Sequence, residues 1–161
     1  FEHLPAVPKD QRAAAAQAYV SLHGQSLAPN TQEKLIANVL TVMADPQIAE
    51  LFAPHSRAEA PIAGFLTRTN GTQIQFHGQI DRYVETDQAI YLVDFKTGSV
   101  PDVDDIADAY VLQMAVYQAL MRAVRGAKPI RCGLVWTQAC RVDWLDDERL
   151  ASSLANMLSG A

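Results

Sequence analysis

The chain has 161 residues, 49% of them hydrophobic and 19% charged, which is the composition of one ordinary globular domain and excludes a wholly disordered chain. No apolar stretch approaches the ~18 residues that a membrane-spanning helix requires. The net charge of −5 disfavours strong binding of nucleic acid by this chain alone, since Lys and Arg supply much of the affinity for phosphates. The chain either receives nucleic acid from attached parts or does not bind it.

Residues 1–55 are predicted to be helical. Alanine and other strong helix formers are frequent in the first half of this segment. Apolar residues recur at spacings of three and four between positions 35 and 43, and Asn30 and Thr31 offer caps for that second helix. Pro54 is expected to end the helical region. The first residues resemble the end of a helix already under way, so we expect the chain to be part of a larger polypeptide.

Three strands are predicted in the middle of the chain. They cover Ala60–Leu66, Gln73–Glu85 and Ala89–Lys96, where apolar, aromatic and β-branched residues gather. Turn residues separate them, at Asn70-Gly71 and again at Asp87-Gln88. The three strands are therefore expected to form two consecutive hairpins.

A long helix is predicted next, from about residue 104 to residue 124. Asp102 or Asp104 can cap its start, while Gly126 and Pro129 can end it. Two strands and a terminal helix are expected to follow, over Ile130–Thr137, Arg141–Leu145 and about 146–158.

The order of these elements predicts a single α/β domain over residues 1–161, with a mixed central sheet flanked by helices and a helical N-terminal lead. The two cysteines, Cys132 and Cys140, are expected to be reduced thiols in or near the core. A metal site would need more ligands than these two provide at this spacing.

The main chemical signal is a pair of aspartates on neighbouring predicted strands. If Asp87 and Gln88 form the tip of an antiparallel hairpin, Asp81 and Asp94 lie directly opposite each other on one face. Lys96 is two residues past Asp94, so it points to the same side. Two carboxylates in this position repel each other unless a cation lies between them or one of them stays protonated.

Such a pair suits a hard cation, Mg²⁺ or Mn²⁺, because its ligands are oxygen atoms. A lysine beside the cation can orient or deprotonate an attacking water, and it can offset charge that builds on a phosphoryl group. The alternative interpretation is that both aspartates are solvated on an exposed face and that Lys96 only screens them.

The predicted helix carries a second anomaly on its apolar stripe, which comprises Ile106, Tyr110, Gln113, Tyr117, Leu120 and Val124. Gln113 is the polar member of this row, and Tyr117 lies one turn after it. One interpretation is a buried glutamine with local hydrogen bonds. The other is a polar pair that reaches over the sheet toward the two aspartates.

Three motifs occur in order along the chain, namely Gly78-x-Ile80-Asp81-Arg82, Asp94-Phe95-Lys96-Thr97 and Gln113-x-x-x-Tyr117. Together they resemble the signature of the RecB-type branch of PD-(D/E)xK nucleases. Within that branch the chain most resembles the C-terminal nuclease domain of the AddA subunit of bacterial AddAB helicase–nucleases. The resemblance covers nearly the whole chain, and it implies a restriction-endonuclease-like core.

The resemblance also assigns roles to individual residues. It implies that Asp81, Asp94 and the main-chain carbonyl of Phe95 are metal ligands and that Lys96 is the catalytic lysine. Glu59 matches an earlier acidic position of the family. Gln113 and Tyr117 match a polar pair that helps to hold DNA or the lysine.

Two features depart from the family pattern. The family carries a metal-binding histidine on a helix that would precede Phe1, and His3 follows too late to replace it easily. We therefore expect these 161 residues alone to bind Mg²⁺ weakly and to cut DNA poorly. Iron–sulfur members of the family need four cysteines, and this chain has two, so no iron–sulfur cluster is expected.

The resemblance implies Mg²⁺-dependent hydrolysis of DNA, with Mn²⁺ as an alternative metal, inside a helicase–nuclease that processes double-strand breaks for recombinational repair. The chain contains no GxxxxGK[ST] loop, so ATP would be used by other domains of the parent polypeptide. The expected partners are single DNA strands from a broken duplex and an AddB-like second subunit. The expected location is the bacterial cytoplasm, without membrane attachment.

Two alternatives remain open at this point. The chain could be a catalytically silent, nuclease-like module that guides DNA or docks a subunit, although such a module has no chemical need for Asp81, Asp94 and Lys96 together. It could also be a stand-alone restriction-type endonuclease, but the sequence shows no recognition element added to the core. Binding of a divalent cation distinguishes the silent module from either enzyme.

Overall fold

The structure, a computed structural model, describes residues 1–53 and 55–160. The helices are α1 (Arg12–His23), α2 (Pro29–Ala44), α3 (Asp108–Arg125) and α4 (Asp147–Ser159), with short 3-10 turns η1 (Leu4–Ala6), η2 (Lys9–Gln11), η3 (Ala49–Phe52) and η4 (Val103–Asp105). The strands are β1 (Arg57–Thr67), β2 (Gln73–Glu85), β3 (Ile90–Lys96), β4 (Ile130–Trp136) and β5 (Arg141–Trp144).

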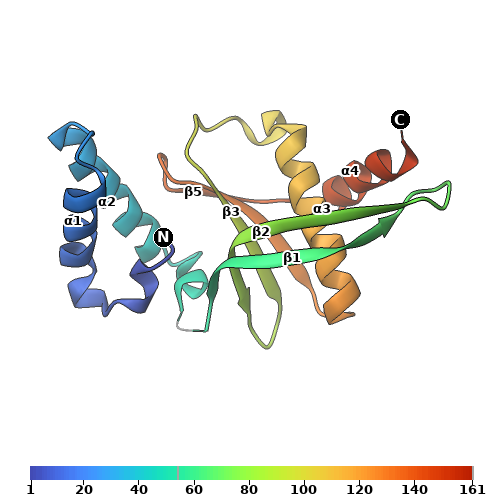
Figure 1. The fold of residues 1–161 in the computed structure, drawn as a ribbon, viewed down its shortest axis with the longest axis horizontal. Coiled ribbons are helices and arrows are strands. Elements are labelled where there is room, and N and C mark those ends of the chain that lie inside the picture. The colour runs from blue at the N-terminus through green and yellow to red at the C-terminus, as the bar shows by residue number, and fades with distance from the viewer. Residues whose placement is uncertain (54, 161) are drawn as a thin grey trace.

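The five strands form one mixed sheet in the order β1-β2-β3-β4-β5. Neighbouring strands are antiparallel except β3 and β4, which are parallel. Two parallel neighbours need a crossover connection, and α3 provides it (Figure 1). The predicted α/β class with a mixed sheet and N-terminal helices is confirmed.

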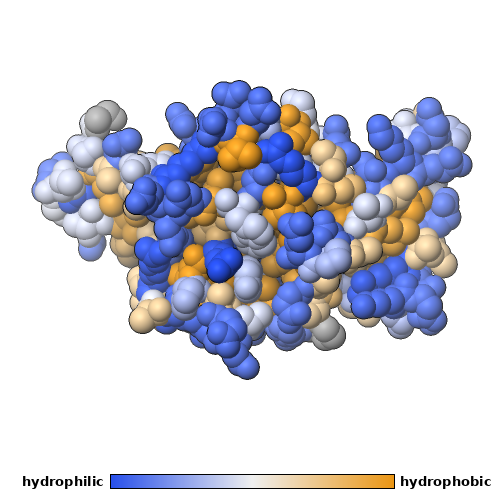
Figure 2. Space-filling model, turned by 180° about the vertical axis from the view of Figure 1, so that it is seen from behind, coloured by the Kyte–Doolittle hydropathy of each residue, from blue (hydrophilic) through white to orange (hydrophobic). Residues whose placement is uncertain are grey.

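Helices cover both faces of the sheet and bury a separate apolar cluster on each. On one face, α3 and α4 pack over Ile80, Leu92 and Leu134. On the other face, the end of α2 and η3 pack over Val93 and Val135. The α1–α2 pair extends sideways from the sheet (Figure 1). Seen from behind, the surface is largely polar, with apolar side chains showing in patches (Figure 2).

The hairpin register expected for β2 and β3 is confirmed. Glu85 pairs with Ile90 and Arg82 pairs with Val93, so the turn between the strands is centred on Asp87 and Gln88 as predicted. The ladder ends at the Arg82–Val93 pair, one step before Asp81 and Asp94.

The strand β2 changes the face that its side chains occupy at Asp81. Side chains two residues apart normally share a face of a strand. Ile80 nevertheless belongs to the cluster under α3, whereas the Arg82 guanidinium lies over the Phe52 ring on the opposite face, 5.5 Å from its centroid. From Gln73 to Ile80, β2 pairs with β1 alone, and this part of the two strands forms a two-stranded arm.

Two predicted helix starts are wrong. Helix α2 begins at Pro29 with Ala28 as its N-cap, so Asn30 and Thr31 lie inside the helix. Proline suits the first helical position because its φ is already helical and it has no N–H group to satisfy. The third helix was expected from about residue 104, but α3 begins at Asp108 without a side-chain cap.

The late start of α3 follows from the burial of Ile106. This residue is extended, with ψ of 123°, and lies in the core ahead of the helix instead of on its stripe. Its carbonyl accepts a hydrogen bond from Arg149 of α4 at 2.9 Å. At the other end of the stripe, Leu120 is buried but Val124 is 74% exposed, because the last turn of α3 lies beyond the packed part of the helix.

Three further expectations concern smaller features. Cys132 is buried and Cys140 half-buried, and both are free thiols, as expected. Residues 1–3 are not helical, so the interpretation of the first residues as the end of a helix is wrong. The role of Pro54 lies outside the described residues. None of the described helices has both the length and the apolar character needed to span a bilayer.

The start of α4 allows a test of helix capping. The Asp146 carboxylate accepts a hydrogen bond from the Glu148 N–H at 2.9 Å, whereas the Asp102 side chain caps nothing at η4. We expect Asp146→Ala to lower the free energy of unfolding by about 1 kcal/mol and Asp102→Ala to change it by much less. Urea unfolding of both variants measures this difference. Equal costs would contradict the assignment of Asp146 as the cap.

Candidate active site

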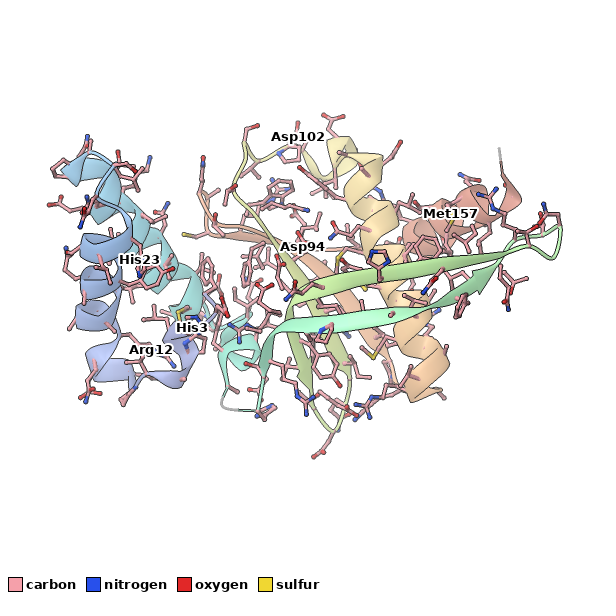
Figure 3. All side chains as sticks on the ribbon, viewed as in Figure 1. His3, Arg12, His23, Asp94, Asp102 and Met157 are labelled. Atoms are coloured by element: carbon pink, nitrogen blue, oxygen red, sulfur yellow. The ribbon has the colours of Figure 1, made fainter. Side chains whose placement is uncertain are left out.

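The candidate site lies at the carboxyl end of β3, where β2 turns away and the connection to α3 begins. Asp94 lies near the centre of the molecule, while His3 and His23 lie with the N-terminal helices (Figure 3). The His3 side chain is 77% exposed and faces Glu2, so the structure does not bring it to the site.

Buried Asp94 forms an ion pair with the partly buried Lys96. The Lys96 ammonium is 2.7 Å from Asp94 Oδ2, and the two side chains are 15% and 8% exposed. They share one face because they are two residues apart on β3, as predicted from the sequence. A buried carboxylate is stable only when its charge is met by partners, and Lys96 supplies the opposite charge.

Gln113 of α3 connects the two members of this pair. Its amide nitrogen donates to Asp94 Oδ1 at 2.9 Å, and its amide oxygen accepts from the Lys96 ammonium at 3.3 Å. Gln113 therefore lies over the sheet toward the acidic residues, which is the second of the two interpretations drawn from the sequence. Its two polar atoms match the opposite charges of Asp94 and Lys96.

Two tyrosines of α3 extend the cluster. The Lys96 ammonium lies over the Tyr110 ring, 3.8 Å from its centroid, which is a cation–π contact. The Tyr117 hydroxyl donates to the Gln79 carbonyl on β2 at 3.1 Å, and the Gln113 amide donates to that hydroxyl at 3.3 Å. Residues of α3 thus contact both strands of the site.

Asp81 is held at the point where β2 and β3 separate. Its Oδ2 accepts a hydrogen bond from the Phe95 N–H at 2.8 Å. Burial raises the pKa of the Asp81 carboxyl, and the negative charges of Asp94 and Glu59 raise it further. The Phe95 hydrogen bond and the positive charge of Lys96 oppose this shift, but the pKa remains above its ordinary value.

Glu59 lies opposite Asp81 in the β1–β2 register, between the Ala58–Arg82 and Ala60–Ile80 pairs. Its φ of 49° is in the left-handed region, which costs a residue other than glycine of order 1–3 kcal/mol. Its side chain is exposed. Among residues 1–53 and 55–160, no three His, Cys, Asp or Glu side chains gather closely enough to hold a metal ion. Glu59 is therefore near Asp81 but is not brought into a common ligand set with the two aspartates.

The two carboxylates that the structure places on adjacent strands suit a hard divalent cation. Asp81 and Asp94 come from adjacent strands, and the Phe95 N–H holds the Asp81 carboxylate beside β3. Each carboxylate oxygen can accept more than one partner, so the bonds that Asp94 already makes leave capacity for a cation. A cation would also offset the repulsion that raises the pKa of Asp81. Oxygen ligands of this type are preferred by Mg²⁺ and Mn²⁺.

Two features of the site were not predicted from the sequence. Tyr110 lies on the predicted helix stripe, and its spacing from Gln113 and Tyr117 is the signal from which its contact with Lys96 could be inferred. In the sequence, Gly78 is only a member of a motif, and nothing there indicates a close contact. A Cβ atom at Gly78 would lie 2.7 Å from the Tyr117 hydroxyl oxygen, so the close approach of the tyrosine requires glycine there.

This close approach can be tested by a double-mutant cycle. We expect Gly78→Ala to lower the free energy of unfolding by about 1–3 kcal/mol through overpacking against Tyr117. In a Tyr117→Leu background the outer half of the ring is gone, so the cost of Gly78→Ala should fall markedly. Gly98→Ala is the control, because a Cβ there would meet nothing within 4 Å. The same cost in both backgrounds would rule out the contact as its cause.

The charge on Asp81 is expected to reduce stability in the absence of metal. Its folded-state pKa is raised, so the stability present while it is protonated is lost as the pH rises through that pKa. Asp81→Asn keeps an acceptor for the Phe95 N–H and removes the charge. In EDTA at pH 7 we expect Asp81→Asn to be more stable than the wild type, with the difference shrinking toward about pH 4.

Thermal unfolding at several pH values measures this effect. Asp87→Asn, at the exposed tip of the hairpin, is the matched control and should change little. A lower stability of Asp81→Asn at neutral pH would contradict the interpretation of the raised pKa.

The sequence of the chain matches a known protein family. The sequence profile of the PD-(D/E)XK nuclease superfamily matches residues 2–154, a span that contains every strand and the whole candidate site. Among solved structures the chain is similar to "Crystal structure of SSO0001", with 15% identity over 91% of this chain and 71% of that chain and a TM-score of 0.44. No curated protein matches it. The match over nearly its full length shows that the chain belongs to the PD-(D/E)XK nuclease superfamily.

Proposed function

We propose that this chain hydrolyses phosphodiester bonds of DNA with a divalent cation, Mg²⁺ or Mn²⁺, bound by Asp81, Asp94 and the Phe95 carbonyl. The observation that carries the proposal is the Lys96 ammonium, 2.7 Å from the Asp94 carboxylate and held on the same face by α3. A partly buried lysine beside two carboxylates has a chemical use in phosphodiester hydrolysis, whereas a solvated pair of aspartates would need neither the burial nor Gln113.

Lys96 is proposed as the catalytic lysine. A divalent cation bound at the carboxylates would supply Lewis acidity and lower the pKa of a water molecule. The Lys96 ammonium, one side chain away, would orient that water and offset the negative charge that develops on the phosphoryl oxygens. Its contact with Asp94 keeps the ammonium close to the reacting group before substrate arrives.

Gln113, Tyr110 and Tyr117 are proposed to position Lys96 and Asp94. Gln113 holds the orientation of both groups through one amide. The Tyr110 ring limits where the ammonium can move. Tyr117 joins α3 to β2 through the Gln79 carbonyl, so it fixes the distance between the helix and the strand that carries Asp81.

A finer proposal concerns the setting of the reaction. The three RecB-type motifs support a place in an AddA-like subunit of a helicase–nuclease that processes broken DNA in the bacterial cytoplasm, with an AddB-like second subunit. The net charge of −5 agrees with a domain that receives its DNA strand from other parts of an assembly. ATP would be consumed by motor domains elsewhere in the parent polypeptide.

The test compares the wild-type protein with Asp81→Ala, Asp94→Ala and Lys96→Ala on linear DNA with Mg²⁺. Each substitution removes either a proposed metal ligand or the group beside the attacking water, so we expect at least about a hundredfold loss of cleavage. EDTA should stop cleavage by the wild type, and added Mg²⁺ or Mn²⁺ should restore it. In a parent helicase–nuclease, ATP-driven unwinding should persist in all three variants.

Asp104→Asn is the matched control, because its exposed carboxylate lies outside the site. Calorimetric titration with Mn²⁺ adds a readout that does not depend on turnover, and the two aspartate variants should bind the cation more weakly than the control. Wild-type cleavage that survives in Asp94→Ala and Lys96→Ala would contradict the proposed roles. Absence of both cation binding and cleavage in the parent polypeptide would favour the silent, nuclease-like module instead.

A further inference from the structure

The outer face of the β1–β2 arm is an exposed surface next to the candidate site. The arm extends away from α1 and α2 (Figure 1). Its inner face packs on α3, as the close approaches of Gly64 to Leu120 and Gly78 to Tyr117 show. The outer face, here called the arm face, consists of exposed alternate residues: Pro61, Ala63, Phe65 and Thr67 on β1, and Gln73, Gln75, His77 and Gln79 on β2.

The arm face carries no acidic side chain. The chain contains 18 acidic residues, yet none lies between positions 60 and 80. The exposed polar groups of β2 on this face are side-chain amides and one imidazole, which can donate hydrogen bonds to phosphate oxygens and to base edges. A polyanion can therefore approach this face without meeting a carboxylate until it reaches the row of Glu59 and Asp81.

Phe65 is the aromatic residue of the arm face. It is 61% exposed and pairs across the arm with Gln75. Its cross-strand partner and its β1 neighbours on the same face, Ala63 and Thr67, are smaller or flexible and leave its ring accessible. An exposed aromatic ring is a platform on which single-stranded nucleic acids can stack a base.

The arm face is continuous with the candidate site. The alternate residues of β2 that are exposed on the arm, from Gln73 to Gln79, are followed in the same row by Asp81. Because β2 changes faces at Asp81, this row passes from the outside of the arm to the side that carries Asp94. Phe65 lies six residues from Glu59 along β1, or ~20 Å at ~3.3 Å per residue. This distance corresponds to roughly six stacked nucleotides at ~3.4 Å each.

We propose that the arm face guides a single DNA strand to the site, with Phe65 as a base-stacking position and the glutamines as contacts to the strand. The proposal rests on the proposed nuclease function for its choice of DNA, and it adds the surface that leads an unpaired strand to the site. A duplex cannot stack its bases on Phe65, since its bases are already paired and stacked with one another.

The test measures binding of a fluorescent oligothymidylate to the protein that carries Asp94→Asn, in EDTA, by fluorescence anisotropy. We expect Phe65→Ala to weaken binding roughly five- to a hundredfold through the loss of one stacked base. Phe65→Trp should retain the affinity. Val124→Ala, which removes another exposed apolar side chain, should leave it unchanged. Gln75→Lys should tighten binding and steepen its salt dependence by about 0.7 in the log–log slope.

A second measurement locates the bound DNA strand on the protein. An oligonucleotide with 5-iododeoxyuridine should cross-link on irradiation to a peptide from residues 61–79, and the cross-link should be lost in Phe65→Ala. Equal affinities of Phe65→Ala and the wild type, or a cross-link only elsewhere, would overturn the proposal. Tighter binding of a hairpin duplex with the same dependence on Phe65 would overturn the single-strand part of it.

Two further outcomes distinguish DNA binding by the arm face from dimerisation of the chain and from the proposed nuclease function. Strand β1 is a sheet edge, so a second copy of the chain could pair with it. A Phe65-dependent dimer in sedimentation, without any effect of Phe65 on DNA binding, would mean that the arm face binds a second copy of the chain and not DNA, and it would overturn the proposal. Cleavage of the same oligonucleotide by the wild type tests the nuclease function separately. Phe65-dependent binding, with no cleavage of the oligonucleotide by the parent polypeptide, would support the arm face and contradict the proposed nuclease.

Discussion

The burial of the Asp94 carboxylate is the constraint on which the rest of the site depends. Removing a carboxylate from water is costly unless its charge and its oxygen atoms both find partners. Lys96, on the same strand, forms an ion pair with one carboxylate oxygen, and Gln113 of α3 donates a hydrogen bond to the other. These two contacts fix the position of α3 relative to β3. The same position brings the Tyr110 ring against the Lys96 ammonium and the Tyr117 hydroxyl to the Gln79 carbonyl of β2.

A second constraint is the separation of β2 from β3 at Asp81. The Asp81 carboxylate accepts the Phe95 N–H, a group that would otherwise lose a strand partner where the ladder ends. The change of faces at this residue, matched by the left-handed backbone of Glu59 on β1, turns the exposed row of the arm toward the site. Strand divergence thus creates space beside two carboxylates and exposes a two-stranded arm with one free face.

The acidic residues of the site work against stability. Asp81 has a raised pKa because it is partly buried and lies near Asp94 and Glu59, and the backbone of Glu59 is strained. Such costs are typical of functional sites, where selection acts on chemistry and the surrounding fold offsets the loss. The two apolar clusters on the faces of the sheet supply that offset, since their largest members are almost fully buried.

Most of the fold and much of the site could be predicted from the sequence, because those features depend on local spacing. The hairpin tip at Asp87 set the register of β2 and β3, strand alternation put Lys96 beside Asp94, and the helix repeat put Gln113 and Tyr117 on one stripe. The tertiary structure alone decided the change of faces at Asp81, the late start of α3 and the fit of Tyr117 against Gly78. These features arise where two elements far apart in the chain compete for the same space, and no periodicity within either element records that competition.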